Sequence, residues 1–77
     1  MATDILVPDL GNEVAEAEVI EWMAGEGDLV TKGETVVVIS TSKTELEIES
    51  PADGTLGLIN VKVGELTTPG AVLGTVH

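Results

Sequence analysis

The sequence of 77 residues contains no cysteine, no arginine, no phenylalanine and no tyrosine, and it has a single histidine. Without cysteine the chain can form neither a disulfide framework nor a thiolate metal site, and cysteine usage does not fix its redox compartment. The one histidine, His77, cannot build a zinc site or a Ser-His-Asp arrangement by itself. These absences exclude two common kinds of catalytic centre.

Positive charge is also scarce, since three lysines stand against 14 acidic residues and the formal net charge is -11. Nucleic acid is therefore excluded as a partner, because phosphate contacts need lysine and arginine, whereas a basic protein partner is favoured. No apolar stretch approaches the roughly 20 residues that span a bilayer. The N-terminal MATDILVPDLG lacks the basic start and long apolar run of a signal peptide. We expect a cytoplasmic protein without membrane contact.

The apolar residues are mostly small or branched, and Trp22 is the only aromatic residue. A core of valine, isoleucine, leucine and alanine favours strands over large interdigitating helices. A length of 77 residues suits one domain, residues 1–77. Trp22 itself is interpreted as a strand residue that fills this core rather than as a residue that docks a partner.

An internal repeat relates GDLVTKG at 27–33 to GELTTPG at 64–70, an offset of 37 residues. Apolar segments follow both copies, at 35–39 and 72–76, and the segments before them, 18–23 and 55–60, also match. Two copies are too few for a solenoid, so we expect two halves related by a pseudo-twofold axis. Such an axis would place residue 43 and the chain ends at opposite poles.

The segment NEVAEAEVIEWMAG, residues 12–25, has good helix formers, a possible N-cap in Asn12 and a possible C-cap in Gly25. Its repeat partner TLGLINV contains Gly57 and β-branched residues and would form a poor helix. The repeat therefore predicts that both segments are strands. With turn signals between several short strands, the chain is predicted to be all-β, a sandwich or a barrel.

Lys43 lies at the predicted tip of a β-hairpin. Residues 36–39 are apolar and are followed by a polar stretch at 40–44. After it, Leu46 and Ile48 alternate with glutamates, which is the period of a half-buried strand. A single amine at such an apex suits covalent attachment of a group by another enzyme, so we expect a carrier module and not an enzyme. Lys32 and Lys62 are interpreted as solvated turn and strand residues.

Four motifs, VPDLG at 7–11, EGD at 26–28, TSKT at 41–44 and SPADG at 50–54, make the chain resemble the lipoyl domains of 2-oxo acid dehydrogenase complexes over essentially its whole length. The resemblance implies a flattened barrel of two four-stranded antiparallel sheets with quasi-twofold symmetry, a barrel-sandwich hybrid. It also implies that Lys43 carries lipoate in amide linkage, with Ser42 and Thr44 as flanking residues for recognition.

The same resemblance implies a swinging-arm function, in which the domain is non-catalytic and passes acyl groups and reducing equivalents between the components of a complex. The implied partners are a lipoate ligase or octanoyltransferase, a thiamine-dependent dehydrogenase component, an acyltransferase catalytic domain and the flavoprotein dihydrolipoamide dehydrogenase. Family likeness also implies contact with a dehydrogenase component for the loop Leu10, Gly11, Asn12 and Glu13, for which the alternative is a simple connector. The sequence leaves open whether the chain stands alone or is part of an acyltransferase.

Two positions depart from the family pattern. Ser42 stands where an acidic residue commonly precedes the lysine, and Asn12 stands where an acidic residue often follows the first glycine. A serine before the lysine also resembles some acetoin-type members, but this single position does not select a substrate.

Three alternatives remain. A biotinyl carrier domain of a carboxylase shares the fold and would put biotin on Lys43, but biotin acceptors typically have methionines where this chain has Ser42 and Thr44. An acyl carrier protein has similar size and acidity, but it uses a serine in an Asp-Ser-Leu setting and is helical. An unmodified acidic interaction module of the same fold would not need Lys43.

The glutamates at 45, 47 and 49 share one face of their predicted strand, because side chains alternate between the two faces of a sheet. Together they could bind a cation. A solvated acidic face is the more common outcome, and no Asp-rich calcium loop is present. We therefore predict no metal site.

Overall fold

The computed structural model describes residues 2–11 and 14–77, which form eight β-strands and no helix. The strands are β1 (Thr3–Leu6), β2 (Ala17–Trp22), β3 (Leu29–Val30), β4 (Thr35–Ser40), β5 (Glu45–Glu49), β6 (Gly54–Ile59), β7 (Leu66–Thr67) and β8 (Val72–Val76). The prediction of strand for the segment around β2 is therefore confirmed over residues 17–22. Local helix propensity is overridden there because the strand pairs on both of its edges.

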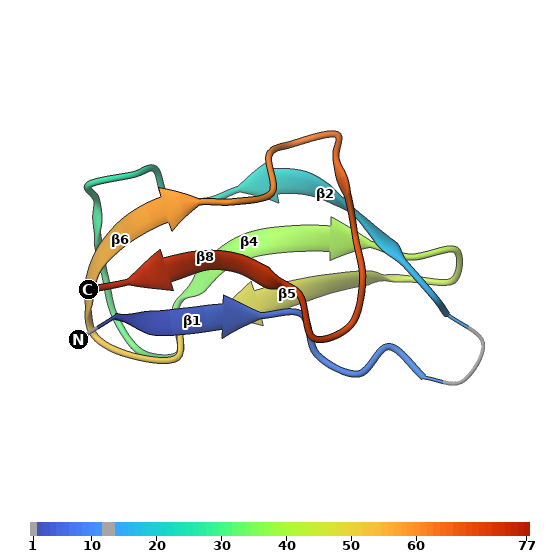
Figure 1. Cartoon of the computed structure of the whole chain (residues 1–77), viewed down its shortest axis with the longest axis horizontal. Coiled ribbons are helices and arrows are strands. Elements are labelled where there is room, and N and C mark those ends of the chain that lie inside the picture. The colour runs from blue at the N-terminus through green and yellow to red at the C-terminus, as the bar shows by residue number, and fades with distance from the viewer. Residues whose placement is uncertain (1, 12–13) are drawn as a thin grey trace.

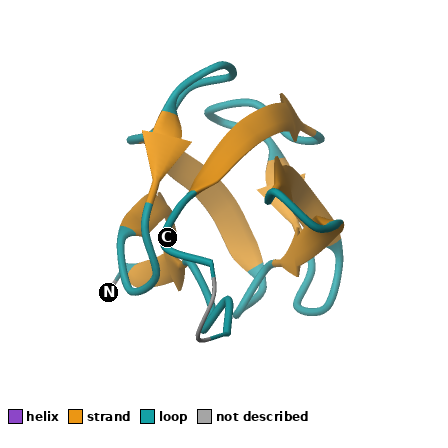
Figure 2. Ribbon diagram, turned by 90° about the vertical axis from the view of Figure 1, so that its right-hand side faces the viewer, coloured by secondary structure: helices purple, strands orange, loops and turns teal. Residues whose placement is uncertain are grey.

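The strands form two four-stranded antiparallel sheets, ordered β1-β8-β6-β3 and β5-β4-β2-β7. Figure 1 shows the long hairpin of β4 and β5 extending along the molecule, and Figure 2, a view along the long axis, shows the two sheets arranged around a common interior. The molecule measures 33 × 20 × 17 Å. The predicted flattened barrel of two four-stranded sheets is thus confirmed.

The interior contains small and branched side chains, as the composition predicts. Its buried members are Ile5, Val7, Ala17, Val19, Val30, Val36, Val37, Ile39, Ile48, Leu56, Leu73 and Val76. Trp22 is half-buried at the margin of this cluster and donates its Nε1–H to the carbonyl oxygen of Val61 at 2.8 Å. Trp22 is therefore a strand residue that packs against the core, as predicted, although it lies at the margin of the core, and its one polar atom is satisfied.

Strand β4 buries two consecutive residues, Val36 and Val37, because its register with β5 shifts between Thr35 and Val37. This irregularity turns Val36 inward as an additional residue, as a β-bulge does. The register of β1 with β8 shifts in the same way at Leu73, which is also fully buried. The two bulges lie 37 residues apart, which is the offset of the sequence repeat.

The repeat appears in the structure as a pseudo-twofold relation between the two sheets. Adding 37 to the residue numbers of β2, β3 and β4 gives those of β6, β7 and β8, apart from the last residue of β4, so these strands are equivalent in pairs. Strand β1 corresponds to β5. Each sheet contains two strands from each half of the chain. Neither half builds a sheet alone, so each half buries its apolar side chains against the other.

A second offset relates β1 to β5. Val7 donates its N–H to the carbonyl of Ala71 and accepts from the N–H of Gly70, both at 3.0 Å. Ser50 makes the same pair of bonds with Glu34, at 2.8 Å, and Gly33, at 3.0 Å. Residue 7 therefore corresponds to residue 50, an offset of 43. The connection from β1 to β2 is consequently six residues longer than the connection from β5 to β6.

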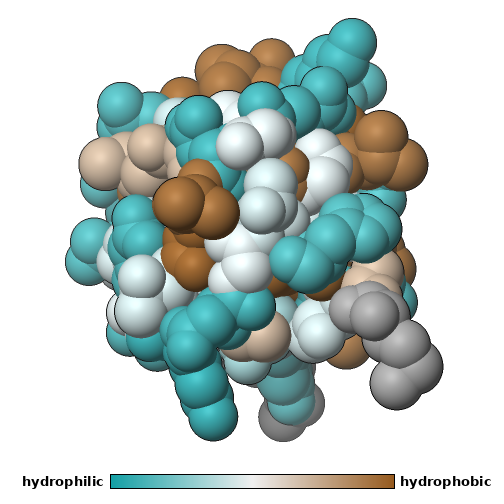
Figure 3. Space-filling view, turned by 90° about the vertical axis from the view of Figure 1, so that its left-hand side faces the viewer, coloured by the Kyte–Doolittle hydropathy of each residue, from teal (hydrophilic) through white to brown (hydrophobic). Residues whose placement is uncertain are grey.

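The chain ends and the β4–β5 turn lie at opposite poles of the long axis, as the predicted twofold axis requires (Figure 1). Thr3 pairs with Val76, so both ends of the described chain lie together. At their pole, apolar side chains form separate patches between polar ones (Figure 3). Lys62 lies in the loop between β6 and β7 and not in a strand, so that prediction was wrong. Within the described ranges, no helix is long and apolar enough to cross a membrane.

Candidate functional site

The hairpin of β4 and β5 carries the candidate site at its tip. Four consecutive cross-strand pairs lead toward the tip, namely Val37 with Ile48, Val38 with Glu47, Ile39 with Leu46 and Ser40 with Glu45. Ile39 and Ile48 are buried, so the base of the hairpin is anchored in the core. The turn at residues 41–44 therefore extends from a rigid support.

The hydroxyl of Thr41 organises this turn. Thr41 Oγ1 accepts hydrogen bonds from the backbone N–H groups of Lys43, at 3.2 Å, and Thr44, at 3.0 Å. The same hydroxyl donates to the carbonyl oxygen of Thr44 at 2.9 Å, and the N–H of Thr41 donates to that carbonyl at 2.7 Å. One side chain thus satisfies backbone groups that the strand ladder does not reach.

The turn contains no glycine, and among the described residues only glycines have positive φ. Two-residue hairpin loops of the common kinds need positive φ, whereas four-residue connections are usually built around a turn that does not. The connection at 41–44 belongs to the longer kind. Thr41 takes over part of the hydrogen bonding, so the tip can consist of Ser42 and Lys43 without backbone strain.

Ser42, Lys43 and Thr44, the three residues predicted at the tip, are all exposed. The two neighbours of Lys43 are short, so they add little bulk beside its side chain. Thr44 Oγ1 donates to the carbonyl of the next residue, Glu45, at 3.4 Å. The lysine is therefore carried on a narrow projection at the pole away from the chain ends, a geometry that fits entry into the pocket of another protein.

The loop from β1 to β2 lies at the same pole. Leu10 is half-buried against the core, and Gly11 has a φ of 92° and donates its N–H to Asp9 Oδ1 at 2.9 Å. Asn12 and Glu13, also predicted for partner contact, lie outside the described residues. Of the four predicted loop residues, Leu10 is thus occupied with the core and Gly11 shapes the turn.

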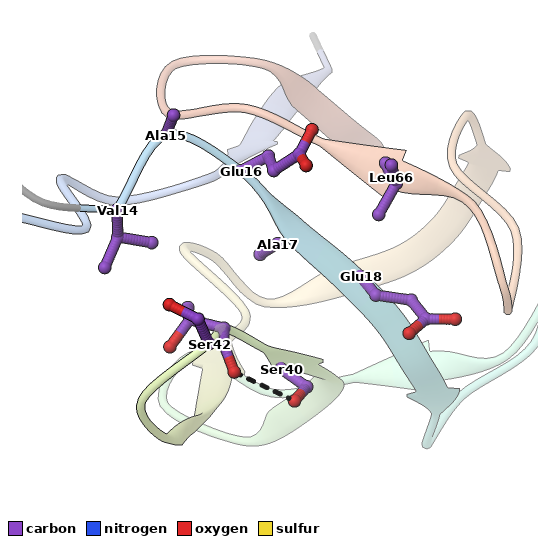
Figure 4. A pocket seen from close by; sticks show the side chains of 9 residues that line it. Val14, Ala15, Glu16, Ala17, Glu18, Ser40, Ser42 and Leu66 are labelled. Carbon is purple, nitrogen blue, oxygen red and sulfur yellow. Dashed lines mark hydrogen bonds between the residues drawn. The ribbon is translucent and has the colours of Figure 1, made fainter.

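A groove of about 410 Å³ separates this loop from the hairpin. Figure 4 shows Val14 and Glu16 from the loop on one side, Ser40 and Ser42 from the hairpin on the other, and Ala17 between them. Thr41, Glu18 and Leu66 complete the lining together with Ala15. Loop and hairpin therefore present a single surface around the tip.

The six additional residues of the β1 to β2 connection break the symmetry of the fold at this pole. The shorter equivalent, between β5 and β6, lies at the pole of the chain ends and is tied down by Asp53 Oδ1, which accepts from the N–H of Lys32 at 2.7 Å. The longer loop instead forms the wall of the groove beside the lysine hairpin. The extra chain therefore lies at the pole with the candidate site.

Comparison with known proteins agrees with this geometry. The biotin/lipoyl family model, described as biotin-requiring enzyme, matches residues 3–76. The solution structure of the lipoyl domain of the 2-oxoglutarate dehydrogenase complex from Azotobacter vinelandii has a TM-score of 0.79 and 30% sequence identity, over 96% of this chain and 94% of that one. The chain is a lipoyl-type member of the biotin/lipoyl family.

Two curated relatives of this lipoyl-type domain are components of larger assemblies. The dihydrolipoyllysine-residue succinyltransferase component of the 2-oxoglutarate dehydrogenase complex of Buchnera aphidicola is 42% identical over 72 residues, 94% of this chain. The dihydrolipoyllysine-residue acetyltransferase component of the acetoin cleaving system of Bacillus subtilis is 42% identical over 73 residues, 95% of this chain. The chain spans 18% of the length of each.

Sequence reasoning predicted Lys43 at the tip of the hairpin, where the structure places it, but missed two features of the site. The role of Thr41 in closing the turn was not predicted, although a threonine that opens a short turn is a known signal for a turn closed by its side chain. The groove was not predicted at all, because its lining comes from three separate segments of the chain. In the described residues, no group of three or more histidine, aspartate or glutamate side chains could hold a metal ion.

Proposed function

We propose that Lys43 is the attachment site for lipoate and that the domain is the swinging-arm carrier of a 2-oxo acid or acetoin-type dehydrogenase complex. The observation that supports this most directly is the presentation of Lys43 on a glycine-free turn fixed by Thr41, at the pole opposite the chain ends. Membership of the biotin/lipoyl family supports the same reading.

Attachment requires an amide bond between Nζ of Lys43 and an activated carboxyl group. The amine must lose a proton, the activating group leaves, and the side chain becomes neutral, so the domain becomes one unit more negative. Ser42 and Thr44, which flank the lysine, are short enough to pass into the active site of a modifying enzyme, a lipoate ligase or an octanoyltransferase. The domain supplies the rigid hairpin and the modifying enzyme supplies the chemistry.

Bound lipoate supplies a dithiolane that accepts an acyl group and two electrons. This chain contributes the position of Lys43, because a tethered carrier raises the effective concentration of its cargo at each partner active site. The proposed partners are a thiamine-dependent dehydrogenase component, an acyltransferase catalytic domain and a flavoprotein dihydrolipoamide dehydrogenase. Both a 2-oxoglutarate and an acetoin component are among the relatives, so the proposal covers either class of complex.

Biotin attachment is the second candidate, because the matching family model includes biotin-requiring enzymes. The short polar neighbours Ser42 and Thr44 and the likeness to a solved lipoyl domain favour lipoate. Lys43 would be the acceptor in either case.

The deciding experiment is co-expression with lipoate–protein ligase and lipoate, followed by intact mass measurement and peptide mapping. We expect a lipoyl group on the peptide that contains Lys43, no modification of Lys32 or Lys62, and none on a Lys43→Arg variant. A biotinyl group on Lys43 would instead show that the protein is a biotin carrier. An unmodified domain, alongside a control domain that the same ligase modifies, would refute the carrier function and favour an unmodified interaction module.

A further inference from the structure

The outer face of the hairpin sheet has an apolar strip bordered by carboxylates on both sides. Val38 on β4 pairs with Glu21 on β2 and with Glu47 on β5, so two glutamates flank one valine. One step closer to the tip, Ser40 pairs with Glu18 and with Glu45. All four glutamates are exposed. The face thus carries two acidic rows that end beside the Lys43 turn.

The apolar residues of this face are open to contact. Val38, between the two rows, and Ile20, on β2 beside Glu21, are half-buried, and Met23, which follows β2, is 56% exposed. They line a shallow groove of about 560 Å³ together with Glu21, Glu45 and Glu47. Since neighbouring strands lie about 4.8 Å apart, the two acidic rows are separated by about 10 Å across β4. That spacing admits one apolar side chain between two basic side chains.

Protection of a sheet edge does not account for this pattern. Acidic residues on β5, an edge strand, would discourage pairing with other chains. Strand β2 is not an edge, because it pairs with both β4 and β7, yet it carries Glu18 and Glu21 on the same face. The acidic residues of β2 therefore need another explanation.

The other sheet provides an internal comparison, because the pseudo-twofold relation gives these strand positions equivalents there. The equivalents of Glu21, Val38 and Glu47 are Leu58, Thr75 and Asp4, so only one of the three positions is acidic there. Gly57 replaces Ile20, and the ring of His77 occupies the space above it, since a Cβ atom on Gly57 would lie 2.3 Å from His77 Cδ2. The fold itself therefore requires neither the carboxylates nor the open strip.

We infer that this acidic face, defined by Glu18, Glu21, Glu45 and Glu47 around Ile20 and Val38, is the docking surface for the enzyme that attaches lipoate to Lys43. The inference rests on the proposed function. The part of that enzyme that binds here is a row of lysine or arginine side chains with an apolar residue between them, because such a row matches the acidic face in both charge and spacing.

Size and selectivity both favour this occupant. A standard interface buries about 800 Å² per partner, a substantial part of the 4529 Å² accessible surface of the domain. An enzyme centred on Lys43 must therefore cover more than the small residues of the turn. It must also reject Lys32 and Lys62, which are exposed as well. Glu45 and Glu47 lie two and four residues after Lys43, within about 14 Å along the strand. The acidic face is therefore adjacent to the hairpin lysine and distinguishes it from Lys32 and Lys62.

The test compares charge removal on this face with the same change on the equivalent position of the other sheet. Glu47→Gln and Glu21→Gln/Glu47→Gln are compared with Asp4→Asn, using initial rates of modification by lipoate–protein ligase with lipoate and ATP. We expect the double variant to raise KM for the domain by about tenfold at low salt with kcat within about twofold, and the single variant by about threefold. Asp4→Asn should stay within about twofold. The differences should shrink in about 0.5 M salt, because exposed charges are screened.

Equal KM values for the double variant, Asp4→Asn and the parent domain would overturn the inference while leaving the lipoylation of Lys43 intact. A parent domain that the ligase does not modify at all would instead refute the proposed function. All substituted residues are exposed, and unchanged urea midpoints would show that the variants fold as the parent does. A lower kcat with an unchanged KM would also contradict docking, since it would indicate an effect on the chemical step.

Discussion

The side-chain hydroxyl of Thr41 accepts a hydrogen bond from the backbone N–H of Lys43 at 3.2 Å, so the residue that opens the turn also fixes the residue at its tip. This relation replaces the glycine that many short hairpin turns require. It also separates two properties of Lys43, because its backbone is held while its side chain is exposed. The turn is therefore a rigid support for a long side chain.

Replacing Thr41 with valine should loosen this turn. Valine keeps the shape and the strand preference of threonine but removes the acceptor for Lys43 and Thr44. We expect the free energy of unfolding to fall by about 1 kcal/mol, since water replaces part of the lost bonding at an exposed turn. Modification of Lys43 by the ligase should slow by about threefold.

Urea denaturation and timed mass spectrometry measure the two effects. Thr41→Ser retains the hydroxyl and should match the parent, and a valine variant equal to the parent in both respects would contradict this role.

Replacing Thr67 with valine should stabilise the domain. Thr67 is 5% exposed and its Oγ1 is buried without a hydrogen-bond partner in the described structure. The pseudo-twofold equivalent is Val30, which is buried in the core with no polar atom in its side chain. A buried hydroxyl without a partner costs about 1–3 kcal/mol, so we expect a gain of about 1 kcal/mol and a rise in melting temperature of about 4–8 °C.

The matched control for this change is Thr68→Val, because Thr68 is the adjacent residue and is exposed. It should alter the free energy of unfolding by less than about 0.5 kcal/mol. A loss of stability in Thr67→Val would show that the hydroxyl contributes to folding, contrary to our expectation.

Replacing Gly74 with alanine should destabilise the domain through overpacking. A Cβ atom at this buried position would lie 2.6 Å from the backbone oxygen of Leu58 and 3.3 Å from the Trp22 ring. The carbonyl belongs to the neighbouring strand β6 and cannot move without distorting the sheet, so we expect a loss of about 2 kcal/mol. Thermal unfolding followed by circular dichroism measures it. Gly25→Ala is the control, since its Cβ would meet only Asp28 Oδ2 at an ordinary 3.6 Å; similar losses at both sites would contradict the packing argument.

The strands and the hairpin could be predicted from the sequence because two independent patterns agreed. The repeat corrected the helix propensity of residues 12–25, and the alternation of Leu46 and Ile48 with glutamates defined β5. The predicted strands around 18–23 and 55–60 are observed one residue earlier, at 17–22 and 54–59. Side-chain period and internal symmetry thus determined most of the architecture.

The features that were not predicted depend on contacts between distant segments. The offset of 43 that relates Val7 to Ser50 appears only when both residues are seen to bond equivalent turns. The placement of the His77 ring above Gly57 joins the last residue to a strand 20 positions earlier. The acidic face needs the register of three strands, of which only the β5 glutamates share a visible sequence pattern. Such relations are set by pairing and not by local composition.

The position of both chain ends at one pole determines how the domain can be attached to a solid support, a label or another protein. A label, a resin or a fused protein joined at either end would leave from the pole opposite Lys43, about the 33 Å length of the molecule away. The domain can therefore be immobilised through either terminus with the hairpin facing solution. A bulky fusion partner should consequently not shield the lysine from a modifying enzyme.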